Sequence, residues 1–303
     1  MEIKLLLNHQ EVVISIEGHE RLLDVLRTAG WMSVKSGGCR QGECGACTVL
    51  MDGEAVNSCM FLAVQVQGHT IETVESLGQQ PQLGWKKTAG FDALQQAFID
   101  SGSVQCGYCT PAMILAARSL LAKNPDPSET EVREALSGVL CRCTAYVKPV
   151  QAVLRAAEMM RGTGHSDHPT AEFEPQISDV DLIPERKVVG KPEKKLDAEK
   201  LVQGKPAFTA DLHMPGMLIA RVLRSPVAHA RITAIDTSKA KALPGVAAVL
   251  TWQDLPRVIY STAGQSDPIP GPLDTFSLDN KVRFVGDRVA FVAAETEAIA
   301  QKA

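Results

Sequence analysis

Residues 38–47 read Gly38-Cys39-Arg40-Gln41-Gly42-Glu43-Cys44-Gly45-Ala46-Cys47, a loop in which three cysteines are separated by small and polar residues. With Cys59 downstream, the four cysteines follow C-x4-C-x2-C-x11-C. The first three have the spacing that wraps thiolates around a [2Fe–2S] cluster of the plant type. Glycine lets such a loop curl closely, so that its N–H groups face the sulfurs. The loop therefore predicts one [2Fe–2S] site.

The segments around this loop indicate a small β-rich domain over residues 1–76. Residues 3–7 and 12–16 are apolar-rich runs on either side of a polar turn, as in a β-hairpin. An amphipathic helix is expected around residues 22–26, ending before Gly30. Asp52-Gly53 between two further apolar runs is a strong signal for a second hairpin, because both turn positions favour positive φ.

A second set of four cysteines lies further along the chain. Cys106 and Cys109 form C-x2-C directly before Thr110-Pro111, which we interpret as a helix N-cap followed by proline at the first helical position. Cys141 and Cys143 form C-x-C after the next expected helix. The positive end of a helix suits an anionic thiolate cluster. These four cysteines predict a second [2Fe–2S] site.

Helical periodicity surrounds the second set, over residues 77–161. Apolar residues recur at helical spacing in residues 91–98 and 114–121. Ser128 with Glu131 has the form of a capping box, and residues 150–160 complete a four-helix unit. Residues 162–185 hold several Gly and Pro and no periodicity, so we expect a linker. Residues 186–303 follow as an α/β segment, with buried strands expected at 217–223, 246–250 and 289–293.

Composition narrows the class of protein. The 303 residues are 45% hydrophobic, with 31 Lys+Arg against 35 Asp+Glu, so nucleic acid is not an expected partner. No apolar run is long enough to span a bilayer and no signal peptide is evident, so we expect a cytoplasmic protein without a membrane partner. Eight cysteines in a reducing compartment indicate metal binding rather than disulfides. Zinc remains the alternative metal for either set, which would make the chain a zinc-binding interaction module.

Three motifs carry a family resemblance. Residues 38–49, residues 105–111 (Gln-Cys-Gly-Tyr-Cys-Thr-Pro) and residues 141–144 (Cys-Arg-Cys-Thr) closely resemble the iron–sulfur portion of the molybdenum hydroxylases, the xanthine dehydrogenase and aldehyde oxidase family. Residues 211–218 and 223–230 resemble the start of that family's large subunit. The resemblance implies an α+β multidomain chain: a β-grasp [2Fe–2S] ferredoxin-like domain, a four-helix [2Fe–2S]-binding bundle and the N-terminal part of an α/β hammerhead domain.

The sequence departs from the family pattern in three ways. No flavin domain separates the helical unit from the hammerhead, so any FAD is expected on a partner subunit. The chain stops inside the hammerhead, which predicts that it holds no catalytic residue and only part of a complete hydroxylase. Direct fusion of these units resembles bacterial selenium-dependent xanthine dehydrogenases and selenate reductase subunits. Ala145 also stands where the family usually has glycine.

The resemblance implies a function and site residues. Electrons would pass from a molybdopterin centre, held mostly outside this chain, through the cluster of Cys106, Cys109, Cys141 and Cys143. They would continue through the cluster of Cys39, Cys44, Cys47 and Cys59 to a flavin or another acceptor. Such a relay serves oxidative hydroxylation of a purine, a related heterocycle or an aldehyde. Carried over by position, Gln105 and the Cys143 backbone would contact the pterin. A stand-alone ferredoxin-type carrier is the other electron-transfer alternative.

Overall fold

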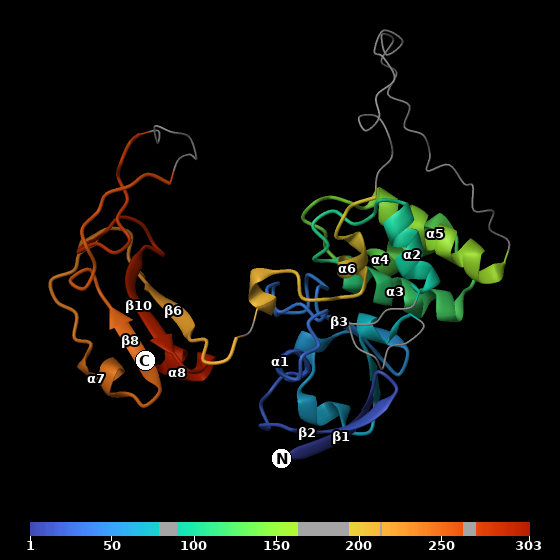
Figure 1. The fold of residues 1–303 in the computed structure, drawn as a ribbon, viewed down its shortest axis with the longest axis horizontal. Helices are drawn as coiled ribbons and strands as arrows, with labels where there is room; N and C mark the ends of the chain where they lie inside the picture. Colours follow the sequence, from blue (N-terminus) through green and yellow to red (C-terminus); the bar gives the residue numbers. More distant parts are fainter. Residues whose placement is uncertain (79–89, 163–193, 213, 263–270) are drawn as a thin grey trace, which may run out of the picture. The chain divides into compact units, whose positions relative to one another are not determined.

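The computed structural model describes residues 1–78, 90–162, 194–212, 214–262 and 271–303 (Figure 1). The chain divides into two compact units, Met1–Leu212 and His213–Ala303. All eight cysteines belong to the first unit. The two units are described separately below.

The first unit begins with a five-stranded sheet in the order β2-β1-β5-β3-β4. Its strands are β1 (Glu2–Leu7), β2 (Gln10–Ser15), β3 (Thr48–Met51), β4 (Glu54–Asn57) and β5 (Thr70–Glu72). β1 and β5 pair in parallel and the other neighbours are antiparallel. Asn8 and His9 turn the first hairpin at φ values of 49° and 67°, and Asp52-Gly53 turns the second at 52° and 86°. Both predicted hairpins are confirmed.

Helix α1 (Leu22–Thr28) covers this sheet and completes a β-grasp domain. Its apolar face, which includes Leu22, Leu23 and Leu26, is fully buried in one core with Ile3 and Ile71 of the strands. Three short 3-10 helices complete the domain: η1 (Ser58–Met60), η2 (Ala63–Val66) and η3 (Val74–Ser76). The cysteine loop leaves α1 and returns into β3, so the sheet fixes both of its ends.

Four helices follow, as the sequence predicts: α2 (Ala93–Asp100), α3 (Thr110–Lys123), α4 (Glu129–Leu136) and α5 (Val147–Arg161). The predicted capping box is confirmed, since the Ser128 side chain accepts from the N–H of Glu131 and the Glu131 side chain accepts from the N–H of Ser128. The predicted cap of α3 is wrong by one residue. Cys109 is the N-cap and Thr110 is already helical, because no side-chain hydroxyl is needed where Pro111 removes a backbone donor.

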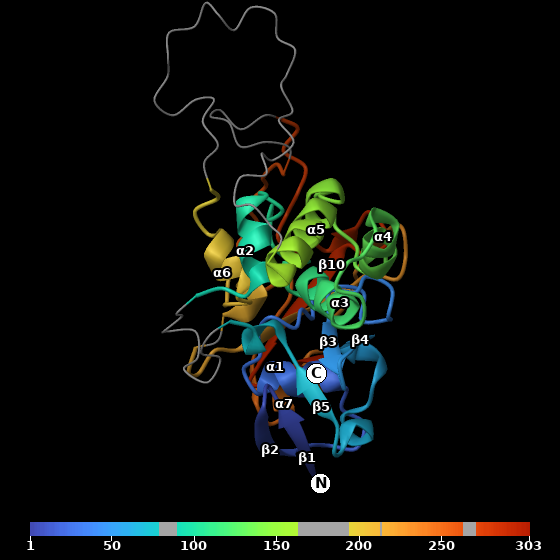
Figure 2. The same ribbon diagram turned by 90° about the vertical axis from the view of Figure 1, so that its right-hand side faces the viewer.

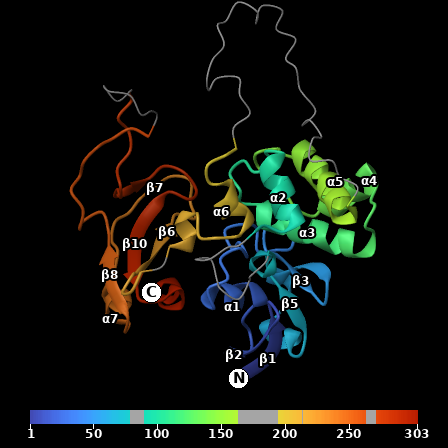
Figure 3. The same cartoon turned by 45° about the vertical axis from the view of Figure 1, so that its right-hand side comes forward.

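The helices and the β-grasp sheet share a hydrophobic core. Leu50 and Val74 of the β-grasp domain lie in the same buried cluster as α2, α3 and α5. The Ser119 hydroxyl of α3 donates to the Gly53 carbonyl at 2.9 Å. Helix α6 (Ala198–Val202) joins this cluster and lies against α2 and α3, and the short η6 (Thr209–Asp211) follows it (Figure 3). Figure 2 shows the helices at one end of this unit and β1 and β2 at the other.

The second unit contains a three-stranded antiparallel sheet in the order β6-β10-β8 and a two-stranded sheet of β7 and β9. Its elements are β6 (Ile219–Arg224), β7 (Ala230–Arg231), α7 (Ser238–Ala242), β8 (Val246–Leu250), β9 (Lys281–Val282), β10 (Arg288–Ala294) and α8 (Glu297–Lys302). The three longer strands fall where the sequence predicts them. The expectation that the first is buried is wrong, because β6 is an edge strand whose side chains are mostly exposed.

The domain boundaries drawn from the sequence stay predictions. Residues 163–185 of the expected linker and the boundary at residue 186 lie outside the described residues. Residues 194–212, placed by the sequence with the hammerhead, pack within the first unit. Across the described ranges, no helix combines the length and hydropathy required to traverse a bilayer.

Candidate iron–sulfur centres

The first cysteine set is arranged as two pairs. The thiols of Cys39 and Cys44 are neighbours, and so are those of Cys47 and Cys59. The first pair lies on the exposed loop between α1 and β3. The second pair is buried, with Cys47 at the start of β3 and Cys59 in η1. The loop that leads into β3 and the short η1 after β4 thus bring four thiols together, although Cys39 and Cys59 are twenty residues apart in the sequence.

Backbone N–H groups converge on the exposed pair. The amides of Gln41, Glu43 and Cys44 each donate to Cys39 Sγ at 3.3 Å, and the Cys39 amide donates to Cys44 Sγ at 3.4 Å. These donors, led by Gln41, lower the pKa of Cys39 to about 7. Burial raises the pKa of Cys47 to about 11. At Cys39 the loop therefore stabilises negative charge on sulfur, as a thiolate ligand requires, whereas burial opposes that charge at Cys47.

Two glycines of the loop are required by close approach. A Cβ at Gly38 would lie 2.5 Å from Cys44 Sγ. Gly45 has φ +69°, and a Cβ there would collide with the Gly138 carbonyl of the helical domain. Glycine is thus required at these two positions because a larger residue would collide with a sulfur at Gly38 and with the neighbouring domain at Gly45.

The four thiols of the second set also lie together. The Cys106 thiol lies beside that of Cys143, and the Cys141 thiol lies beside those of both Cys109 and Cys143. The four thiols thus form one connected group that joins the loop before α3 to the loop before α5. The Cys106 amide donates to Cys143 Sγ and lowers the pKa of Cys143. Burial raises the pKa of Cys106 and of Cys109. Cys109, as N-cap of α3, stands at the positive end of a fourteen-residue helix.

The pairing fits the groups that the spacing predicts. A [2Fe–2S] cluster held by four cysteines has two irons, each bound by two thiolates, so it needs two pairs rather than one convergent quartet. The first set offers two thiol pairs, and the second brings four thiols side by side. In the described ranges, no three or more Cys, His, Asp or Glu side chains converge to hold a single metal ion. All eight cysteines are free thiols.

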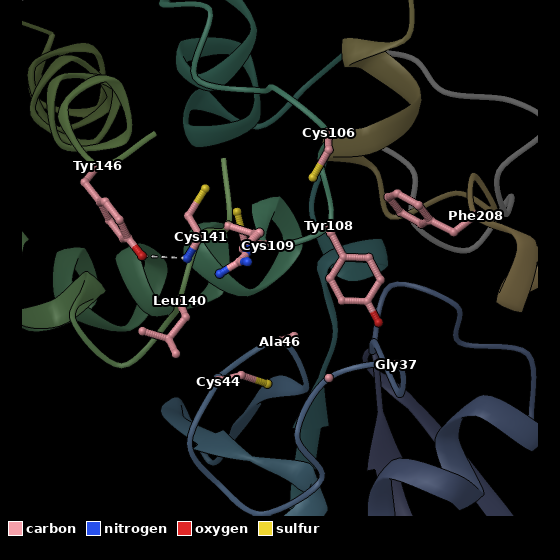
Figure 4. Close-up of a pocket in the computed structure, with 12 residues that line it drawn as sticks. Gly37, Cys44, Ala46, Cys106, Tyr108, Cys109, Leu140, Cys141, Tyr146 and Phe208 are labelled. Carbon is pink, nitrogen blue, oxygen red and sulfur yellow. Dashed lines mark hydrogen bonds between the residues drawn. The ribbon is translucent and has the colours of Figure 1, made fainter. Parts of the chain in front are cut away.

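A cavity of about 690 Å³ lies between the two sets (Figure 4). Cys44 lines it from the β-grasp domain, and Cys106, Cys109 and Cys141 line it from the helical domain. Figure 4 shows Tyr108 reaching across from the helical side toward Gly37. The two cysteine sets therefore face a common space, which brings the two predicted sites together.

The predicted pterin contacts, Gln105 and the Cys143 backbone, belong to the two loops that carry the second set. Gln105 is exposed, and the amide that it shares with Cys106 is the one that donates to Cys143 Sγ. Cys143 is half-buried. Ala145, where the family has glycine, is buried without a positive φ, and Thr144 takes the left-handed conformation at φ 60° instead. The substitution is thus accommodated without strain at Ala145, and the pterin contacts stay predictions.

Sequence reasoning missed several residues that shape these sites. The Tyr146 hydroxyl accepts a 2.8 Å hydrogen bond from the Cys141 amide (Figure 4). In the sequence, Tyr108 stands out only as part of a motif, although its ring lies between the two sets (Figure 4). The buried Lys35, four residues before Cys39, pairs with Asp211 at 3.0 Å. Its position before the loop was the only local signal, because its partner is 176 residues away.

Comparison with known families accounts for most of the chain. Residues 5–71 match the 2Fe-2S iron-sulfur cluster binding domain, and residues 73–154 match the [2Fe-2S] binding domain. Residues 203–303 match the a/b hammerhead domain of aldehyde oxidase and xanthine dehydrogenase. The small FeS subunit of nicotinate dehydrogenase from Eubacterium barkeri is 48% identical over 159 residues, covering 52% of this chain and 94% of that subunit. This chain belongs to the xanthine dehydrogenase and aldehyde oxidase family of molybdenum hydroxylases.

Longer members of the family align with the whole chain. A probable hypoxanthine oxidase of Escherichia coli strain K12 is 36% identical over 303 residues, which is 100% of this chain and 30% of that protein. The structure of an aldehyde oxidoreductase from Desulfovibrio gigas superposes with a TM-score of 0.79 at 32% identity, covering 100% of this chain and 32% of that one. The chain thus spans about a third of these relatives and corresponds to their iron–sulfur and hammerhead segment. The predicted fold class is confirmed.

Proposed function

We propose that residues 1–161 carry two [2Fe–2S] clusters that relay electrons for a molybdenum hydroxylase. Cys106, Cys109, Cys141 and Cys143 hold the cluster nearer the molybdopterin. Cys39, Cys44, Cys47 and Cys59 hold the cluster that delivers electrons to a flavin or another acceptor. The observation that carries the proposal is the gathering of four thiols in each set, with cysteines of both sets lining one shared cavity.

The relay suits a two-electron oxidation. Hydroxylation of a substrate C–H bond by water releases two electrons and two protons, and each [2Fe–2S] cluster carries one electron at a time. Two clusters in series can therefore hold both electrons until an acceptor takes them. The N–H donors on Cys39 favour the more negative reduced state of the first cluster, which supports its place as the later, electron-collecting site.

The partners follow from this relay. A molybdopterin-binding region supplies the electrons, with Gln105 and the Cys143 backbone as its contacts on this chain. FAD, where used, is held by a partner subunit. The substrate is a purine, a related heterocycle or an aldehyde, the classes named for the relatives above. Eight free thiols suit the reducing cytoplasm, where we place the protein.

Metal analysis of anaerobically purified protein tests the proposal. Iron, acid-labile sulfide and zinc are measured, and electron paramagnetic resonance (EPR) spectra are recorded after dithionite reduction. About four irons and four sulfides per chain with two S = 1/2 signals are expected, since each set of four cysteines binds two irons. Stoichiometric zinc without those signals in fresh protein would overturn the relay and favour the zinc-binding module instead.

A further inference from the structure

Residues 198–211, which we call the strap, cross both cysteine-bearing domains. Helix α6 at the start of the strap packs on α2 and α3 (Figure 3). The Gln95 side chain donates to the Val202 carbonyl at 3.1 Å in the buried core. Leu201 lies directly on the Gly107 backbone, where a Cβ would be 2.6 Å from Leu201 Cδ1. The strap therefore begins in contact with the loop that carries Cys106 and Cys109.

The far end of the strap is anchored in the β-grasp domain. The Asp211 side chain is 2% exposed, and its oxygens lie 3.0 Å from Lys35 Nζ and 3.2 Å from an Arg27 guanidinium nitrogen. The same guanidinium donates to the Ala210 carbonyl at 2.9 Å. Burial opposes ionisation of Asp211, but the hydrogen bond and charge of Lys35 hold its pKa below the usual range. The buried Asp211 carboxylate is thus paired with two cations, and one of them, Lys35, lies just before the Cys39 loop in the chain.

The middle of the strap touches the residue that spans the two sets. The Phe208 ring packs edge-on against the Tyr108 ring, with centroids 5.1 Å apart (Figure 4). Lys35 Nζ lies 4.8 Å from the Phe208 ring centroid. The Tyr108 amide faces Cys106 Sγ, and its hydroxyl lies against the Gly37 backbone, where a Cβ would be 2.7 Å from the hydroxyl oxygen. Contacts therefore run without interruption from Asp211 to both cysteine loops.

We propose that the strap sets the separation of the two cluster loops, with Asp211 and Phe208 as its positioning residues. Asp211 fixes Lys35 at the entrance of the Cys39 loop, and Phe208 holds Tyr108 between the loops. Asp211 acts through Lys35 and Phe208 acts through Tyr108, so both are positioning residues. The proposal rests on the proposed function in one respect: the separation matters because electron tunnelling between clusters falls steeply with distance.

Two variants of the full chain and one matched control test the strap. Asp211→Asn removes the charge and leaves Lys35 and Arg27 buried against a neutral amide. Phe208→Leu keeps an apolar side chain but loses the ring contact, and it serves if the first variant fails to fold. Asp279→Asn is the control, because Asp279 is also buried and is paired with Arg257 at 3.1 Å and Arg283 at 2.8 Å in the second unit.

Three measurements are made on each protein: iron and sulfide content, magnetic dipolar coupling between the two reduced clusters by EPR, and amide hydrogen exchange over residues 198–212 and 35–47. We expect full cluster content, an altered dipolar coupling and faster exchange in both strap variants. For Asp211→Asn the exchange should be on the order of 100-fold faster, the factor implied by breaking one partner of a buried ion pair. Asp279→Asn should leave coupling and exchange in these segments unchanged.

The outcomes separate the two proposals. Parental coupling and parental exchange in both strap variants, with full cluster content, would overturn the strap and leave the relay intact. An altered coupling in Asp279→Asn would also overturn it, because the effect would not be specific to the strap. Absence of iron and sulfide from the parent would overturn the relay, while the exchange comparison would still decide whether Asp211 and Phe208 hold the two loops.

Discussion

The backbone N–H of Leu140 donates a 2.9 Å hydrogen bond to the carbonyl oxygen of Cys44. Leu140 precedes Cys141 in the chain, so this single bond joins the peptide before a cysteine of the second set to a cysteine of the first. Gly45 and Gly138 meet beside it. The seam between the two domains is therefore formed by backbone at the point where the cysteine sets approach.

Gly45→Ala should destabilise this seam strongly. The new Cβ would collide with the Gly138 carbonyl and would impose an unfavourable φ of +69° on alanine. We expect a loss of roughly 3 kcal/mol in the free energy of unfolding, combining the left-handed backbone cost with overpacking. Urea unfolding of the parent and the variant measures this loss in the free energy of unfolding.

Gly53→Ala is the matched control for Gly45→Ala. Gly53 has φ +86°, but its Cβ would meet nothing within 4 Å. Only the backbone cost of about 1–2 kcal/mol should remain. Equal losses in the two variants would show that the contact with Gly138 adds nothing and that the seam is not tightly packed there.

Cys44→Ser and Cys141→Ser should each remove one cluster and leave the other. The two sets are built from separate loops and pair only within themselves. We expect about half of the parental iron in each variant and a different surviving EPR signal, so each variant is the control for the other. Loss of both signals in a folded Cys44→Ser protein would contradict independent sites.

Arg142→Gln should lower the reduction potential of the second cluster. Arg142 is exposed and stands between Cys141 and Cys143, where its charge favours the more negative reduced state. The expected shift is on the order of tens of millivolts at a partly solvated site. EPR-monitored redox titration measures it. Arg133→Gln on α4, whose guanidinium pairs with Glu129, should leave the potential unchanged, and an equal shift there would point to overall charge rather than to Arg142.

Local signals in the sequence were enough to predict the local structure. Asp52-Gly53 and the Ser128 capping box involve residues within a few positions of each other, and the structure confirms both. Long-range packing could not be predicted in this way. The partner of Lys35 lies 176 residues away, and β6 is exposed because it is an edge strand, which its own apolar sequence does not reveal. Cysteine spacing predicted two quartets but not the thiol pairs within them.

Glu75→Gln should flatten the dependence of stability on pH. Burial raises the pKa of Glu75, against hydrogen bonds from Ser33 and Thr73, with Lys35 as the nearby cation. Because the pKa of Glu75 is raised in the folded state, its neutral carboxyl contributes fully to the stability of the fold at pH values below the unfolded-state pKa of about 4.3. That stabilisation is lost as pH rises through the folded-state pKa. The variant should therefore gain stability relative to the parent as pH rises.

Urea unfolding between about pH 5 and pH 8 measures this difference for Glu75→Gln. Glu11→Gln, at an exposed position on β2, is the control and should follow the parental profile. A Glu75→Gln protein that is less stable than the parent by a constant amount across the range would show that hydrogen bonding from Ser33, and not titration, governs this site.

Gln105→Ala should leave both clusters assembled and weaken the contact with the pterin in the full-length enzyme. Gln105 is exposed, so truncating its side chain should not disturb the packing that holds the cysteines. Iron, sulfide and EPR signals of the variant chain should match the parent. Turnover and molybdenum content of the full-length enzyme should fall, because the pterin loses a partner beside Cys106. Gln96→Ala on α2, which removes a hydrogen bond to Asp100, is the control and should leave turnover and molybdenum content unchanged. Unchanged turnover and molybdenum content in Gln105→Ala would remove Gln105 from the pterin site, leaving the Cys143 backbone as the predicted contact.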